Sequence, residues 1–338
     1  MIRPATSQDM SSIVALLTQD ARERSALDPL LWRIAADAPD RIERTAGASL
    51  NGHHAPAREL WFVAEHAGRI VGVTHAMLVP VPPIYDGTAG PPGLLLDDCF
   101  VSADAPSGTA EALLAATEAA LTTAGAPRLI ASCPAAGRLR PLYERHGYEP
   151  VTLYMAKHRL RHEALSPSVR MAGAEDVPGI VKRSTEHRQA LSRINPRFWR
   201  IHPDADCRFE AWMRRSLTFR DRDMLVATAG GEVRGYVIAQ PIAPLLVPAA
   251  HEITAIGVVD DFYDEDLQTS RPSRQTRRAA RTYWQRQKAR LRDAPSTAPS
   301  SFALRGGRPK SLSWNRAAIR SPSSGCCGID IGVCAARA

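Results

Sequence analysis

The sequence predicts a mixed α/β fold built as two related copies in tandem, the second one incomplete, followed by a disordered basic tail. Three observations predict it. Helix-like and strand-like segments alternate along residues 1–267, a residue pattern recurs at a nearly constant offset, and the composition changes sharply near Leu267. At about 100–200 residues per domain, the length suggests two domains. We expect the complete copy over residues 1–162, the partial copy over 167–267 and the tail over 268–338.

The repeat is the most direct sign of duplication. The letters IRPA at 2–5 recur as VRMA at 169–172, and DPLLWRI at 28–34 recurs as NPRFWRI at 195–201, both at an offset of 167. Further along the offset becomes 163, so that VAEHAGRIVG at 63–72 matches VATAGGEVRG at 226–235. Asp97-Asp98 falls on Asp260-Asp261 at the same offset. The similarity ends near Leu267.

The first copy has a clear order of expected elements. Apolar spacing and a cap at Ser7 or Asp9 predict a helix over residues 8–24, followed by a looser helical stretch around Trp32. Apolar and β-branched runs around a glycine-containing turn predict a hairpin of strands 61–65 and 70–79. A third strand is expected over residues 94–101.

The rest of the first copy alternates between helix and strand. An Ala/Leu-rich run predicts a helix over residues 108–124, ended by Gly125. A strand over 128–133, a short helix over 138–146 ended by Gly147, and a last strand over 148–155 complete the expected copy. Cys99 and Cys133 fall in expected strands, where we interpret them as small core residues.

The basic charge belongs to the tail. Residues 268–338 hold 15 basic and 2 acidic side chains, whereas residues 1–267 hold 28 basic and 33 acidic ones. One interpretation is a disordered arm that binds nucleic acid by phosphate neutralisation. The other, which explains the Arg, Ser, Pro, Ala and Cys mixture better, is a frameshift near codon 267. We therefore do not expect a nucleic-acid partner.

Several classes of protein are excluded. No apolar run reaches the ~18 residues of a membrane-spanning helix, and the first residues lack the pattern of a signal peptide. Six cysteines are too few for a disulfide scaffold. His53-His54 has no further ligand in register, so we expect no metal site. We expect a soluble, cytoplasmic protein without a membrane partner.

The segment LYERHGY at 142–148 follows one expected strand and precedes another. It resembles the helix-turn-strand signature of the GNAT acetyltransferase superfamily. The resemblance covers residues 1 to about 160 and again 167 to about 267, as in tandem members of that superfamily. It implies acetyl-CoA as co-substrate and a small-molecule or peptide amine as acceptor. The activity implied is that of an N-acetyltransferase.

The resemblance also implies where the diphosphate of acetyl-CoA binds. The matching segment is the strand end and helix start that contain Phe100, Val101, Ser107, Gly108, Thr109 and Ala110. The first turn of a helix has free amides and a positive dipole end, and glycine lets the backbone approach a phosphate. Two positions depart from the family pattern, because Ala105 replaces an Arg or Gln and Ala136 replaces an Asn.

Tyr143 matches the family's general acid, which protonates the departing thiolate. Asp97 or Asp98 would act as the base, and successive strand residues face opposite sides, so at most one of them can face the site. Backbone amides near Phe100 and Val101 would stabilise the oxyanion. The alternatives are a core aromatic residue at 143 and a solvated acidic pair.

At the level of the whole chain, the alternative is a degenerate, non-catalytic interaction module. We expect Trp32 and Trp199 to pack the second helix onto the sheet. The alternative is that they form a wall of the substrate site.

Overall fold

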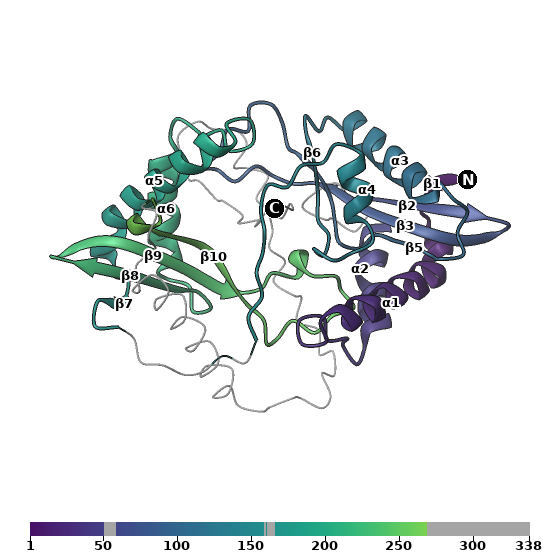
Figure 1. Ribbon diagram of the computed structural model, residues 1–338, viewed down its shortest axis with the longest axis horizontal. Helices are drawn as coiled ribbons and strands as arrows, with labels where there is room; N and C mark the ends of the chain where they lie inside the picture. Colours follow the sequence, from purple (N-terminus) through teal and green to yellow (C-terminus); the bar gives the residue numbers. More distant parts are fainter. Residues whose placement is uncertain (51–58, 159, 161–165, 269–338) are drawn as a thin grey trace, which may run out of the picture.

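The computed structural model describes residues 1–50, 59–158, 160 and 166–268, and forms two lobes with a sheet in each (Figure 1). The expected mixed α/β fold is confirmed. Residues 269–338 of the predicted tail and the His53-His54 pair lie outside the described residues. Within them, none of the helices has the length and apolar character needed to cross a membrane.

The first half has a central sheet with helices on both faces. In chain order its elements are β1 (Ile2–Pro4), η1 (Ser7–Asp9), α1 (Met10–Leu27), α2 (Ala38–Leu50), β2 (Glu59–His66), β3 (Arg69–Leu78), β4 (Gly93–Leu95), β5 (Phe100–Val101), α3 (Thr109–Thr123), β6 (Leu129–Ala131) and α4 (Arg140–Arg145). The sheet order is β1-β2-β3-β4-β6, with β5 also paired to β3. All pairs are antiparallel except β4 and β6, which run parallel.

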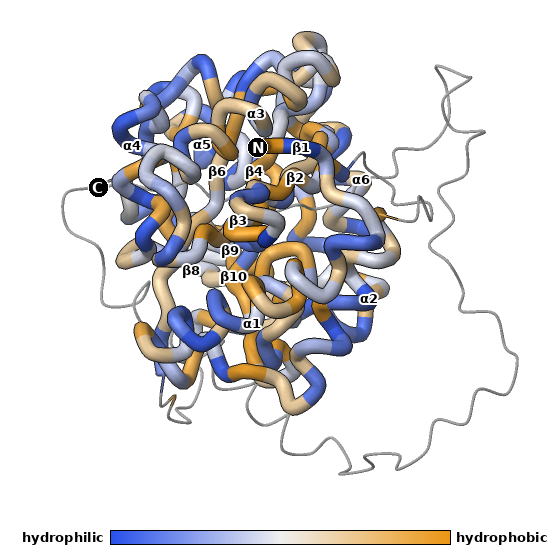
Figure 2. Tube along the Cα trace, turned by 90° about the vertical axis from the view of Figure 1, so that its right-hand side faces the viewer, coloured by the Kyte–Doolittle hydropathy of each residue, from blue (hydrophilic) through white to orange (hydrophobic). Residues whose placement is uncertain are grey.

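Successive side chains of a strand point to opposite faces of the sheet, so the first half has a packed layer on each face. Val73 packs in one core with Ile13 of α1 and Ile42 of α2. On the opposite face, Thr74 and Thr117 of α3 share a hydrogen bond of 2.8 Å. Gly72 allows this close approach, because a Cβ there would lie 2.8 Å from Leu113. Figure 1 shows the sheet between α3 and α1, and Figure 2 shows hydrophobic residues concentrated along β2, β3 and β9.

The second half repeats the order of the first. Its elements are β7 (Val169–Met171), η2 (Ala174–Asp176), α5 (Val177–Ile194), α6 (Ala205–Ser216), β8 (Asp223–Ala229), β9 (Glu232–Pro241), η3 (Pro244–Leu246), β10 (Gly257–Asp264) and η4 (Glu265–Gln268). Both ends of α5 follow those of α1 at the offset of 167, and both ends of β9 follow those of β3 at the offset of 163. The described sheet, β10-β9-β8-β7, is antiparallel throughout.

The same cap begins the first helix of each half. Arg3 holds Asp9 with two hydrogen bonds of 2.8 and 2.7 Å, and Asp9 accepts the Thr6 amide. In the second half, Arg170 holds Asp176 at 2.6 and 2.8 Å, and Asp176 accepts the Gly173 amide. The hydrogen bonds from Arg3 lower the pKa of Asp9 to about 2. The helix start expected near Asp9 thus has a buried ionic cap.

Three expected elements differ in the structure. The strand expected over 94–101 is interrupted by a bend at Asp97, so β4 and β5 are separate strands. The stretch around Trp32 forms a turn and an isolated bridge, and the helix comes later, as α2. Residues 148–155 form no strand, because Pro150 has no amide to donate and limits the conformation of Glu149.

The halves contact each other through two reciprocal sets of interactions. The segment after α1 pairs with the loop after β9 through Ile34 and His251, and the segment after α5 pairs with the loop after β3 through Ile201 and Tyr85. Ile201 is the counterpart of Ile34 in the repeat, where NPRFWRI matches DPLLWRI. In each half, therefore, the loop after a central strand contacts the segment that follows the first helix of the other half.

Side chains follow the same reciprocity. Trp32 lies 5.2 Å from the His251 ring, and Trp199 lies 5.2 Å from the Tyr85 ring. Arg41 of α2 donates to His251 O at 3.3 Å, while Arg208, its counterpart in α6, donates to Pro83 O at 3.1 Å. Both tryptophans thus contact a loop of the opposite half, a role the sequence did not suggest.

Candidate functional site

The candidate site lies where two strands of the first sheet separate. β4 and β6 are paired in parallel, and the Ser132 amide extends the ladder by donating to Leu95 O at 2.9 Å. Beyond this point β5 pairs with β3, and the chain after β6 turns toward α4. A cavity of about 410 Å³ occupies the divergence. β5, the first turn of α3, the start of α4 and the inner side of α1 surround it.

The lining brings together part of the predicted cofactor set. Phe100, Val101 and Ala110 line the cavity, whereas Ser107, Gly108 and Thr109 lie just before the α3 residues that do so. Gly108 has a φ of 82° and is the N-cap of α3. A left-handed backbone there favours glycine. The α3 amides that have no acceptor within the helix are at the cavity edge.

The backbone of β5 presents one amide to the cavity. The Ser102 amide donates to Val71 O in β3 at 2.9 Å. Because successive amides of a strand point to opposite edges, the Val101 amide faces away from β3, toward the cavity. The Phe100 amide faces β3, so of the two predicted oxyanion donors only Val101 has the right direction.

Two arginines provide the positive charge that is missing at Ala105. Arg138 and Arg145 line the cavity beside the α3 N-terminus. Arg138 donates to Val101 O at 3.3 Å, and its guanidinium lies over the Phe100 ring, 5.0 Å from the centroid. Both side chains are more than half exposed, and they pair with Glu23 and Glu111. Their guanidinium groups therefore lie at the mouth of the cavity in exposed ion pairs.

Buried charges of α1 form the floor of the site. Arg24, only 4 % exposed, donates from Nε to Asp20 Oδ2 at 2.6 Å, and its Nη1 lies 3.6 Å from Asp97 Oδ1. Burial raises the pKa of Asp20 to about 6, although Arg24 opposes the shift. Burial also raises the pKa of Asp97. Asp20 lines the cavity, so a carboxylate that titrates near neutrality faces it.

Asp98 points to a different partner. Its Oδ2 lies 3.3 Å from His75 Nδ1, and His75 Nε2 lies 3.3 Å from Glu59 Oε2. The His75 ring stacks on Trp61, with centroids 3.9 Å apart. Burial lowers the pKa of His75, but its hydrogen bonds to Asp98 and Glu59 outweigh this and raise it. Asp98 therefore belongs to a buried chain of polar contacts that continues through His75 to Glu59.

Tyr143 lies behind the cavity. It is 5 % exposed, packs with Leu95 and Leu114, and lines a neighbouring cavity along β6 together with Cys133 and Tyr148. Burial raises its pKa well above 10, and the nearby Cys99, Cys133 and Asp97 add to the shift. Cys99, one of these neighbours, does line the cavity at the divergence.

Sequence reasoning missed Asp20, Arg24 and His75. The signal for Asp20 and Arg24 was an oppositely charged i,i+4 pair on the apolar side of the first helix. Cys99 is buried and its thiol donates to Leu96 O at 3.2 Å, which agrees with the core role expected for it.

No protein-family model matches the sequence, and no curated protein sequence matches it. Solved structures do match, each over about half of this chain. Several are acetyltransferases. A predicted acetyltransferase from Clostridium acetobutylicum, solved with acetyl-CoA, is 18% identical over 47% of this chain and 95% of its own, with a TM-score of 0.36. A GCN5-related N-acetyltransferase from Ralstonia eutropha is 21% identical over 46% of this chain and 96% of its own, with a TM-score of 0.37.

A further match is the ribosomal-protein-alanine N-acetyltransferase from Brucella melitensis. It is 19% identical over 48% of this chain and 97% of its own, with a TM-score of 0.33. Each of these three matches spans nearly the whole of the solved chain and about half of this one.

Proposed function

We propose that the first half transfers the acetyl group of acetyl-CoA to the amine of a small molecule or peptide. The observation that carries this proposal is the cavity at the divergence of β4 and β6, which joins a helix N-terminus, an outward strand amide and a carboxylate of raised pKa. We also propose that residues 1–162 and 167–267 are two tandem domains. Acetyl transfer then belongs to the first of them.

Asp20 is the proposed base. An amine is mostly protonated at neutral pH, with a lysine-like pKa near ~10.4, and must lose a proton before it attacks the thioester carbonyl. A carboxylate with a pKa of about 6 is ionised at pH 7 and still able to accept that proton. Asp97 faces Arg24 from the other side and holds the guanidinium in place.

The Val101 amide and Tyr143 take the remaining roles. The amide lies at the cavity edge of β5, where it can donate to the oxygen that becomes negative when the new C–N bond forms. When the C–S bond breaks, Tyr143, from its place behind the cavity, is the proposed acid that gives its hydroxyl proton to the thiolate. Arg138, Arg145 and the first α3 amides bind the phosphates of the donor.

One observation favours the alternative, a non-catalytic interaction module. Arg138 spans the edge of the cavity, bonded to Val101 O at 3.3 Å and paired with Glu23 at 3.0 Å. If Arg138 keeps these contacts, it covers the edge of β5 along which the extended acetyl-CoA chain would bind.

The experiment is an assay of thiol release from acetyl-CoA with a panel of amines, using the full chain and the Tyr143→Phe variant. An enzyme releases thiol only with an accepted amine, and Tyr143→Phe lowers turnover by about 10²-fold or more while acetyl-CoA binding is retained. Tyr148→Phe is the matched control, because the Tyr148 ring lies 5.3 Å from the Tyr143 ring, tilted by 51°, while its hydroxyl donates to Glu118. Thiol release that is the same with and without every amine supports the non-catalytic module.

A further inference from the structure

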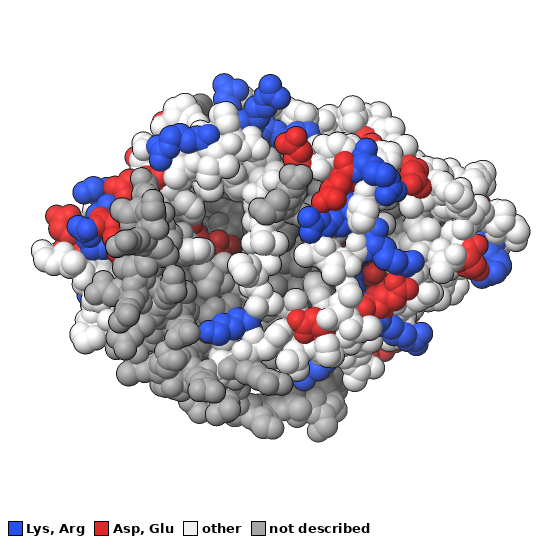
Figure 3. All heavy atoms as spheres, in the orientation of Figure 1, with Lys and Arg blue, Asp and Glu red and all other residues white. Residues whose placement is uncertain are grey.

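A separate cavity of about 330 Å³ lies between the two halves. The helices α5 and α6 and the strands β9 and β10 of the second half form one side, and the loop after β3 forms the other. Figure 3 shows a hollow near the middle of the molecule, with acidic atoms set back in it. The mechanism proposed for the first half makes no use of this cavity.

The walls of the cavity are largely apolar. Aromatic side chains line it from both halves, among them Tyr85, Trp199 and Phe209, and Leu191 lies in the same lining. The Tyr85 and Trp199 rings are themselves in contact, with centroids 5.2 Å apart. A cavity of this size suits a small molecule, and aromatic walls favour a ligand that carries a ring.

The charged side chains of the lining are of both signs. They are Asp86, Asp260, Asp261, Arg128, Arg188 and His187. Each of them interacts with another group of the chain. An ion in the cavity would leave its hydration shell without meeting an unpaired opposite charge, which is costly. The lining therefore favours a neutral ligand.

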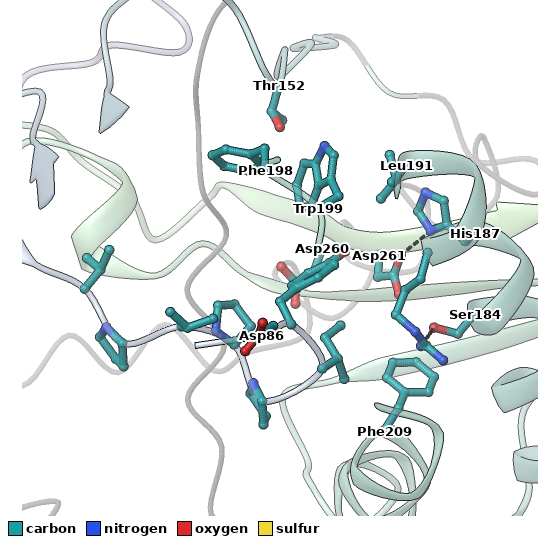
Figure 4. A pocket seen from close by; sticks show the side chains of 18 of the residues that line it. Asp86, Thr152, Ser184, His187, Leu191, Phe198, Trp199, Phe209, Asp260 and Asp261 are labelled. Carbon is teal, nitrogen blue, oxygen red and sulfur yellow. Dashed lines mark hydrogen bonds and ion pairs between the residues drawn. The ribbon is translucent and has the colours of Figure 1, made fainter. Parts of the chain in front are cut away.

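His187 stands at the end of a chain of polar contacts. The Tyr236 hydroxyl donates to Asp261 Oδ2 at 2.7 Å, and His187 Nδ1 lies 3.2 Å from Asp261 Oδ1. Figure 4 marks the second contact with a dashed line. The His187 ring also stacks on Tyr263, with centroids 5.4 Å apart. Because the carboxylate accepts, Nδ1 carries the hydrogen of the neutral imidazole, and Nε2 is left as a hydrogen-bond acceptor.

This acceptor is available to a ligand. Within the part of the chain that the structure describes, no group donates to His187 Nε2, and the side chain, 27 % exposed, lines the cavity. At the offset of 167, His187 is the counterpart of Asp20. Each half thus places an acceptor at the same position of its first long helix, facing its own cavity.

We propose that this cavity binds a small neutral aromatic molecule whose hydroxyl donates to His187 Nε2. The ring of the ligand packs against Trp199, Tyr85 and Phe209. Asp261 holds the His187 ring in the tautomer that can accept. The site is separate from the acetyl-transfer site, so the ligand binds without acetyl-CoA.

The test is calorimetric titration of the full chain with 4-ethylphenol, and with 1-ethyl-4-fluorobenzene, in which a fluorine replaces the hydroxyl. We expect the phenol to bind with a stoichiometry of one per chain in the absence of acetyl-CoA, about tenfold tighter than the fluorinated probe, which cannot donate. Equal affinity for the two probes, or no binding of the phenol at millimolar concentration, overturns the proposal.

Two variants locate the site. His187→Phe keeps a ring but removes the acceptor, so it weakens the phenol about tenfold and leaves the fluorinated probe within about threefold. Asp261 keeps the Tyr236 hydroxyl as a donor in this variant. Leu191→Trp fills part of the cavity and weakens both probes about tenfold or more.

His66→Phe is the matched control, because His66 is an exposed histidine at the end of β2 and does not line the cavity. It leaves the affinity for both probes unchanged. Thermal unfolding confirms that each variant folds. Phenol binding that is unchanged in both His187→Phe and Leu191→Trp contradicts the proposal.

Discussion

Arg24 in the first half and Leu191 in the second occupy equivalent positions of the repeat, on the helices α1 and α5. Around Arg24 the structure is filled, because its guanidinium holds Asp20 and Asp97 and lies on Trp32. Around Leu191 the counterparts Asp260 and Trp199 line a cavity. The exchange of Arg24 for Leu191, together with that of Asp20 for His187, thus gives the two halves different charged groups at equivalent positions.

The two halves also differ in their acidic groups at this place. Burial raises the pKa of Asp20 to about 6, the charges of Asp98 and Asp97 add to the shift, and Arg24 opposes it. In the second half, position 187 is a histidine that pairs with Asp261 at 3.2 Å. The base proposed for acetyl transfer is therefore present in one half only.

The largest expected effect is on turnover in Asp20→Asn. We expect a loss of about 10²–10⁴-fold, because the base is removed while the side-chain volume is kept. In the unmodified protein, kcat/KM rises with pH up to about 6 and then levels off, since Asp20 must be deprotonated to accept a proton. The variant lacks this rise.

Glu23→Gln is the matched control, since Glu23 lines the same cavity from the next turn of α1. It should keep both the turnover and the pH step. If the rise of kcat/KM with pH persists in Asp20→Asn, a group other than Asp20 causes it.

The next effect is on stability in Arg24→Leu, which makes the first half like the second. Removing the guanidinium leaves Asp20 and Asp97 buried without a cation, and we expect a cost of about 3–5 kcal/mol in the free energy of unfolding by urea. The loss is smaller at pH 5 than at pH 8. Both carboxyls have raised folded-state pKa values, so stability falls as pH rises through those values and is regained on protonation.

Leu191→Met in the second half should cost less than about 1.5 kcal/mol. If Arg24→Leu costs as little, the ion cluster does not hold the first half together.

A smaller effect is expected at the rim of the first-half cavity. Arg138→Gln with Arg145→Gln should raise the KM for acetyl-CoA about tenfold and weaken its dependence on ionic strength, because two phosphate contacts are lost. Arg140→Gln is the control, since Arg140 pairs with Glu144 and lines the cavity along β6 instead. An unchanged KM in the double variant shows that the phosphates bind elsewhere.

The smallest effect compares the two reciprocal contacts between the halves. Arg41→Gln and Arg208→Gln each remove a part-buried hydrogen bond to a carbonyl of the opposite loop. We expect each to lower the free energy of unfolding by about 0.5–1.5 kcal/mol, and by similar amounts. A cost from one substitution alone would show that the two contacts are not equivalent.

Much of the fold could be predicted from the sequence, since apolar periodicity and glycine ends place α1, α3 and the hairpin of β2 and β3 well. The bend at Asp97 could not, because it depends on Arg24 and His75, which come from distant elements. The Phe100 and Val101 region was found by resemblance. Asp20 was missed because a charge on the inner side of a helix resembles an ordinary i,i+4 pair until burial is known.

The two tryptophans illustrate the same limit. Trp32 and Trp199 stood out through the repeat, but the sequence does not tell which half each one contacts. Their partners, His251 and Tyr85, lie on loops of the opposite half, far away along the chain.

The central claim is that the first half binds acetyl-CoA and the described second half does not. Calorimetric titration of the full chain with acetyl-CoA tests it most directly. The account predicts one molecule per chain, weakened by Arg138→Gln with Arg145→Gln, and at ~100 times Kd a stabilisation of about 2.7 kcal/mol. No binding to the folded protein, or two equivalent sites per chain, would contradict it.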